Sequence, residues 1–227
     1  MNLILIKKLN LSMRHILFLL SFLTIFPSFG QISYDFSEPL PIDEKSITSV
    51  SSYDFGTYIS ENNETKYVFD SKGIWIETTI FSSISKETIR ESSKYVVRNG
   101  FIFGVISNDS LPCVLENDRY HFGLKNKEQV IGENSLNVLK KLNSSSYLLN
   151  FKENGGFTPS IFIFTGKILT IQHFDYETGT SQFSAIVNQS SKKIEGMNYI
   201  TLSPSNEEWK ELDKNILFGS KYTYLRK

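Results

Sequence analysis

The chain has few of the residues on which common catalytic and metal sites depend. Its 227 residues include one cysteine, three histidines and two tryptophans. A single cysteine excludes a disulfide within the chain, so the fold must be held by packing, for which 18 Phe and 11 Tyr supply apolar area. No Gly-x-Ser-x-Gly elbow, His-Glu-x-x-His helix or phosphate-binding glycine loop occurs. These absences disfavour enzymatic activity without excluding it, and we expect no metal and no cofactor.

An excess of charge of either sign is also missing. The 24 Lys and Arg residues balance 24 Asp and Glu residues. No basic cluster is available to follow a phosphate backbone, so nucleic acid is not an expected partner.

The first thirty residues have the composition of a secretory signal peptide. Lys7, Lys8 and Arg14 precede the apolar run 16–26 (ILFLLSFLTIF), and small residues follow it in the segment 27–30. That run is shorter than the roughly 20 residues that a transmembrane helix requires. We therefore predict export to the periplasm or the exterior, with no transmembrane span after signal cleavage.

Cleavage is predicted directly before Gln31, which leaves a mature chain with a net charge of −3 because residues 1–30 contain three cations and no anion. Either Met1 or Met13 can be the start, since MRHILFLL alone makes a compact signal. We predict an extended lead-in over residues 31–52, with Pro39 and Pro41, and a single antiparallel β domain over residues 53–227.

Alternation of apolar and polar residues dominates the rest of the chain. In GIWIETTIF, Ile74, Ile76 and Ile80 share one strand face with Thr78. Asn99-Gly100 suits a two-residue hairpin turn between the strands of KYVVRNGFIFGVIS. Further strands are expected at RYHFGLK (119–125), SYLLNFK (146–152), SIFIFTG (160–166), KILTIQHFDYE (167–177), NYITL (198–202) and KYTYLRK (221–227).

Two segments are ambiguous between helix and strand, 85–95 (SKETIRESSKY) and 134–143 (NSLNVLKKLN), and we favour strand for both. One helix is predicted near the C-terminus. Ser205 and Glu208 form a capping box, and the helix runs to about Lys214, burying Trp209 and Leu212. The expected fold class is therefore all-β, an antiparallel meander forming a barrel or a strongly curved sheet, with one short C-terminal helix.

The cysteine lies eight residues before a histidine, in LPCVLENDRYHFGL (111–124), which raises the possibility of a thiol–imidazole pair. A three-residue turn places Cys113 opposite His121, whereas a two-residue Asn117-Asp118 turn places it opposite Phe122. The two-residue register gathers the apolar side chains on one face. We therefore predict that Cys113 is a buried apolar residue, with the Cys113–His121 dyad as the alternative.

His173 and Asp175 lie two residues apart in QHFDYE, so both could reach one metal ion or one proton. No third ligand is evident, and we interpret the pair as a polar strand end near solvent. Glu77, Glu87 and Glu91 are further carboxylates that could be considered for catalysis, but we interpret them as exposed charges on strands, which is the ordinary case for such residues. No catalytic, metal-binding or ligand-binding residue is therefore predicted beyond the weak candidates Cys113, His121, His173 and Asp175.

The order of strands and turns from Gly56 to about Phe151 resembles that of the small secreted lipocalin-like proteins of bacteria. The similar segments are FGTYIS, YVFDSKGIWIETT, KYVVRNGFIFG and VLKKLNSSSYLLNF. The resemblance covers about half of the predicted mature chain, and Tyr58 stands where that family usually has Trp. The resemblance implies a β-barrel or half-barrel in the cell envelope, with an apolar pocket.

From these features we expect an exported, non-catalytic β module that binds a small apolar ligand or an envelope partner. The alternative is a small hydrolase or transferase that uses Cys113–His121 or His173–Asp175. The identity of the ligand or partner, the closure of the barrel and the oligomeric state stay open at this level.

Overall fold

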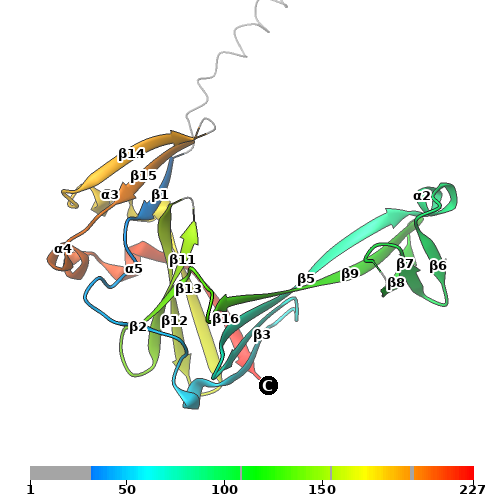
Figure 1. The fold of residues 1–227 in the computed structure, drawn as a ribbon, viewed down its shortest axis with the longest axis horizontal. Helices are drawn as coiled ribbons and strands as arrows, with labels where there is room; N and C mark the ends of the chain where they lie inside the picture. Colours follow the sequence, from blue (N-terminus) through cyan, green and yellow to red (C-terminus); the bar gives the residue numbers. More distant parts are fainter. Residues whose placement is uncertain (1–31, 108, 154, 195–196) are drawn as a thin grey trace, which may run out of the picture.

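The computed structural model describes residues 32–107, 109–153, 155–194 and 197–227 (Figure 1). The predicted signal segment, residues 1–30, lies outside the described residues. The strands are β1 (Ile32–Phe36), β2 (Ser46–Ile47), β3 (Gly56–Ser60), β4 (Thr65–Asp70), β5 (Gly73–Ser85), β6 (Val96–Arg98), β7 (Phe101–Phe103), β8 (Ser110–Glu116), β9 (Arg119–Ile131), β10 (Val138–Lys141), β11 (Ser146–Glu153), β12 (Gly156–Thr165), β13 (Ile168–Phe174), β14 (Gln189–Ile194), β15 (Met197–Leu202) and β16 (Phe218–Arg226). The helices are a 3₁₀ turn, η1 (Ser52–Asp54), and the α-helices α2 (Lys86–Glu91), α3 (Tyr176–Phe183), α4 (Asn206–Glu211) and α5 (Lys214–Leu217).

The predicted all-β, mainly antiparallel class is confirmed. All sixteen strands belong to one sheet, with the order β14-β15-β1-β12-β13-β16-β3-β4-β5-β9-β8-β7-β6 and with β11, β10 and β2 branching from β12. The terminal strands of this path, β14 and β6, do not pair with each other, so the sheet is open and does not close into a barrel. In the part of the chain that the structure describes, no helix is both long and apolar enough to cross a bilayer.

The beginning of the predicted lead-in is a strand rather than an irregular segment. Strand β1 pairs in parallel with β15, and Phe36 lies opposite Phe157 of β12. The lead-in that follows is fixed by buried polar groups. The amide of Asn150 accepts a bond from the Leu40 N–H at 2.9 Å and donates to the Leu40 carbonyl at 2.8 Å. Lys140 donates to the carbonyls of Pro39 and Pro41 at 2.8 and 2.6 Å, so its buried ammonium is hydrogen-bonded.

The helices differ from the prediction in number and position. The segment 85–95, predicted as strand, begins with α2, because Ser85 accepts a bond from the Thr88 N–H and caps the helix. The segment 134–143 does contain the predicted strand, β10. Asp175 ends the predicted strand 167–177 early, because its side chain caps α3.

The predicted C-terminal capping box is present, and it opens α4 rather than a helix reaching Lys214. Ser205 accepts from the Glu208 N–H while the Glu208 carboxylate accepts from the Ser205 N–H. Trp209 is 5% exposed and contacts Phe36 edge to face, with ring centroids 6.3 Å apart. The helical segment therefore packs against β1, although more than 150 residues separate the two elements.

Side chains fill the interior of the body, by which we mean the sheet and short helices without the long ribbon of β5 and β9 described below. One apolar cluster is built from aromatic rings of β3, β4, β11, β12 and β16, which pack mostly edge to face. A second cluster joins β1 to the short helices. The buried aromatic residues of the first cluster are Tyr58, Tyr67, Phe69, Tyr147, Phe162, Phe164 and Tyr224.

Strands β5 and β9 continue past the body as a long ribbon, which is plain in Figure 1. Strand β4 pairs with β5 only as far as Thr78, so the ribbon is two-stranded where it leaves the body. At its far end α2, β6, β7 and β8 enclose a small third cluster around Ile102, Leu111 and Phe122. We call residues 79–125 the arm, with a two-stranded neck and a distal head.

Candidate functional site

Cys113 and His121 lie on opposite faces of the arm, as the two-residue register predicts. The sheet pairs Cys113 with Phe122 and Val114 with His121. Asn117 and Asp118 form the two-residue turn, and both have positive φ, 48° and 57°. The polarity argument therefore selected the correct register, and the thiol–imidazole dyad does not form.

Cys113 packs against the cluster of the head and is partly buried. This burial raises the pKa of the Cys113 thiol, which keeps the thiol protonated and a weak nucleophile. His121 is exposed on the other face. The structure gives neither residue a partner of the kind that nucleophilic catalysis requires.

His173 and Asp175 serve different elements. The pairing of β13 with β16 is irregular between Gln172 and Phe174, so the strand distorts at His173. The Nδ1 atom of His173 lies 2.9 Å from the hydroxyl of Ser160 on the neighbouring strand. The Asp175 carboxylate instead accepts from the N–H groups of Glu177 and Thr178, at 3.0 and 3.2 Å. The metal or proton pair is therefore not assembled.

Ser160 is the partner of His173 that sequence reasoning missed. A two-residue turn, Gly166-Lys167, joins the two expected strands, and counting back from it places Ser160 opposite His173. Burial lowers the pKa of His173, so the ring is neutral at pH 7 and can accept a hydrogen bond from the Ser160 hydroxyl. Ser160 is 2% exposed, which leaves no approach for a substrate to its hydroxyl.

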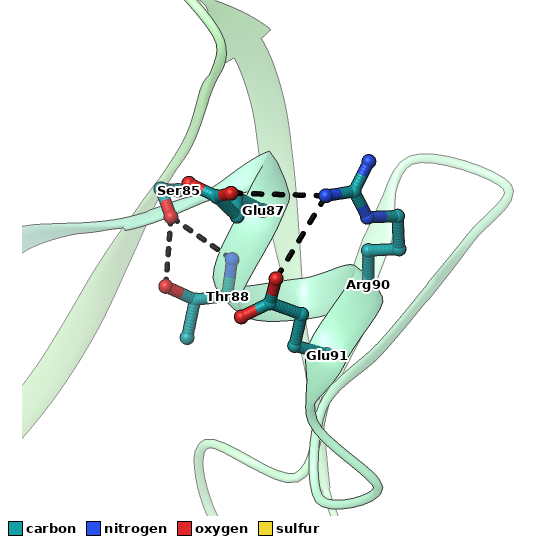
Figure 2. A network of polar contacts seen from close by, with 5 residues as sticks. All are labelled: Ser85, Glu87, Thr88, Arg90 and Glu91. Atoms are coloured by element: carbon teal, nitrogen blue, oxygen red, sulfur yellow. Dashed lines mark hydrogen bonds and ion pairs between the residues drawn. The ribbon is translucent and has the colours of Figure 1, made fainter.

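The three glutamates are paired with cations rather than with one another. Glu77 lies 2.9 Å from the Lys127 ammonium, and this bond is the main cause of the lowered pKa of Glu77. Glu87 and Glu91 both contact the Arg90 guanidinium on the exposed surface of α2, at 3.7 and 3.8 Å (Figure 2). Within the described ranges no group of three or more His, Cys, Asp or Glu side chains could hold a metal ion.

The most distinctive surface is one face of the arm, which sequence reasoning did not single out. Cross-strand pairs place Phe81 beside Gly123 and Val114 beside His121 on this face. Phe81 and Val114 are 68% and 69% exposed. The missing side chain of Gly123 leaves room for Thr79, because a Cβ there would lie 2.9 Å from the Thr79 Cγ2 atom, whereas the Phe81 ring would be at the ordinary contact distance of 3.8 Å.

Cations surround these apolar residues. The same face, which we call the arm face, continues toward the body through the Glu77–Lys127 ion pair, and the Lys127 ammonium lies 5.1 Å from the centroid of the Trp75 ring. On the strands, its charged members are four cations, Lys66, Lys125, Lys127 and Arg119, and two carboxylates, Glu77 and Glu116. Glu64 borders the face, because its carbonyl accepts from the Thr79 N–H. The arm face is therefore apolar in its middle and cationic overall.

No family model, curated protein or solved structure matches the chain. The lipocalin-like resemblance stays a prediction that rests on the order of strands and turns alone.

Proposed function

We propose that the protein is an exported, non-catalytic interaction module that binds an acidic protein partner through its arm face. The observation that carries this proposal is the position of Phe81 and Val114, each about two-thirds exposed on a cationic face of an arm that projects from the body (Figure 1). The partner is expected in the cell envelope or outside the cell.

Exposed aromatic and aliphatic side chains on a projecting element are typical of protein-binding surfaces. Scattered single residues would need no explanation, but Phe81 and Val114 share one face of a narrow ribbon that has no other layer over it. Aromatic residues in the middle of a patch with charged residues around it also match the anatomy of protein interfaces.

The charges of the arm face favour a partner that carries a net negative charge. Four Lys and Arg side chains outnumber two carboxylates, and Lys127 already neutralises Glu77. Complementary potential speeds association and excludes partners of like charge. An acidic surface that presents a small apolar pocket therefore fits the arm face.

Two other functions have less support. A small apolar ligand needs an open interior, but aromatic rings fill the interior of the body. Hydrolysis or group transfer needs converging groups, but Cys113 and His121 lie on opposite faces, and His173 and Asp175 bind different partners.

Export rests on the composition of residues 1–30, and N-terminal sequencing of the purified protein tests it, with Gln31 expected as the first residue.

Affinity capture from an envelope fraction of the producing organism tests the binding function. We expect one acidic protein to be retained by the natural chain, released as salt is raised and lost when Phe81 and Val114 are both changed to Ser. Changing Ile168 and Leu225 to Ser provides the matched control, since this exposed apolar pair lies on the body, 39% and 60% exposed. Equal retention by the two double variants would contradict the role of the arm face.

A further inference from the structure

One edge of the neck is an open strand edge. The Thr79 N–H donates to the Glu64 carbonyl at 2.7 Å, and this is the last bond between β5 and the hairpin beside it. From Ile80 to Ser85 the other edge of β5 pairs with β9, and within the described residues no strand lies against the outer edge. An open edge presents unpaired backbone donors and acceptors to other chains.

The bond of Thr79 also shows which residues point outward. Backbone groups alternate along an antiparallel strand, so the N–H and C=O groups of Phe81 and Ser83 face the same way as those of Thr79. Among the described residues, these groups accept one hydrogen bond, from the Arg119 guanidinium to the Ser83 carbonyl at 3.2 Å. That carbonyl keeps a second lone pair for another donor.

The side chains of this edge do not protect it. The segment 78–85, TTIFSSIS, contains no charged residue, no Gly and no Pro, although about a fifth of the chain is charged. Charged residues usually keep open edges from pairing. The neighbouring strand β9 follows that rule along its own open edge, where Lys125, Lys127 and Glu128 are exposed. Of the two strands of the neck, only β5 therefore has an edge without charged residues.

We propose that this edge of β5 pairs, antiparallel, with the same edge of a second copy of the chain. The alternation of backbone groups permits two symmetric registers over this short edge, with Ser82 opposite Ser82 or Ser83 opposite Ser83. The first register places Ile80 opposite Ile84 twice and brings Ile80, which is 56% exposed, into an apolar contact. Neither register brings charged residues of β5 together, but the Arg119 guanidinium at the Ser83 carbonyl has to move aside when the strands pair. Each contact occurs twice because the pairing is two-fold symmetric.

This inference goes beyond the proposed function because it uses the edge of β5 rather than the arm face and needs no second protein. The purified full chain is therefore sufficient to test it. We expect a mass of two chains in solution, and a mass of one chain when Ser82 is changed to Lys, which places two like charges close to the symmetry axis in both registers.

Cysteine cross-linking tests the geometry. With Cys113 changed to Ser, we expect either Ser82→Cys or Ser83→Cys to form a disulfide-linked dimer under mild oxidation, since paired Cα atoms lie about 4.5 to 5.5 Å apart. Lys125→Cys, on the opposite strand of the same neck, is the control and should remain monomeric. A natural chain that is monomeric at its highest soluble concentration would overturn the proposal. So would cross-linking at residue 125 that equals or exceeds cross-linking at both edge positions, whatever the capture experiment shows.

Discussion

At the scale of single residues, His173 links stability to pH. Burial lowers its pKa below the ordinary value, so the folded protein holds this proton more weakly than the unfolded chain does. Its contribution to the free energy of unfolding is therefore complete above about pH 6.5, and it is lost as the pH falls from there through the folded-state pKa.

Changing His173 to Asn should flatten this part of the pH dependence while keeping a polar group near the Ser160 hydroxyl. Denaturant unfolding at pH values on either side of 6.5 measures the effect. His121→Asn is the control, because it removes an exposed histidine instead of a buried one. A slope that persists in His173→Asn would show that other groups cause it.

Asp35 is a buried carboxylate with an unusual environment. It is 5% exposed, and neither of its carboxyl oxygens has a hydrogen-bond partner among the described residues. A Cβ at residue 156 would lie 2.2 Å from the Asp35 Cγ atom, so Gly156 makes the space that the carboxylate occupies. Burying a carboxyl group without a hydrogen-bond partner is unfavourable, so this residue opposes folding.

Asp35→Asn should therefore raise the free energy of unfolding by about 1 kcal/mol or more, since it keeps the shape and removes the charge. Asp54→Asn serves as a comparison of opposite sign, because Asp54 accepts a hydrogen bond from the Tyr147 hydroxyl at 3.1 Å. Denaturant unfolding of both variants measures the difference. A loss of stability in Asp35→Asn would show that the carboxylate has a stabilising partner.

At the scale of elements, α4 is held by packing rather than by its own six residues. An isolated helix of this length is unstable in water, and its buried face is Trp209 against Phe36 of β1. Trp209→Ala should cost roughly 3 kcal/mol or more of unfolding free energy. Trp75→Ala, which removes a partly exposed ring, should cost clearly less in the same thermal or denaturant experiment. Equal losses would mean that α4 is not anchored by its tryptophan.

The sequence predicted the elements whose signals are local. Asn99-Gly100 forms a hairpin turn with positive φ at both residues, and the polarity pattern around Cys113 selected its register. The segment 85–95 was assigned wrongly because Ile89 fits a strand as well as a helix, and the Ser85 cap decided between them. The pairing of β1 with β15 was beyond prediction, because more than 150 residues separate the two strands.

The candidate sites show the same division. Cys113–His121 was rejected correctly from a pattern within fourteen residues, and Ser160–His173 was within reach through the turn between their strands. The arm face was not predicted, because its exposure depends on where β4 ends relative to β5. The residues of β5 alone do not indicate where β4 ends.

At the scale of the whole molecule, the C-terminal strand joins two parts of the sheet. Strand β16, which includes most of the predicted strand KYTYLRK, pairs with β13 on one side and with β3 on the other. Deleting residues 218–227 should open two internal strand edges and cause aggregation. Replacing the much longer segment 82–122 with an Asn-Gly turn should leave the melting temperature of the body nearly unchanged, because Phe81 and Gly123 already lie opposite each other. Soluble, cooperatively melting protein without β16 would contradict this organisation.

The central claim is that the arm face contacts another protein. The most direct measurement is site-specific photo-cross-linking in the producing organism, with a photoreactive side chain in place of Val114, which lies on the arm face away from the open edge of β5. The same group in place of Ile168 on the body serves as the control. We expect an adduct with one acidic protein at residue 114 and none at residue 168. Absence of a protein adduct at residue 114, or the same adducts at both positions, would contradict it.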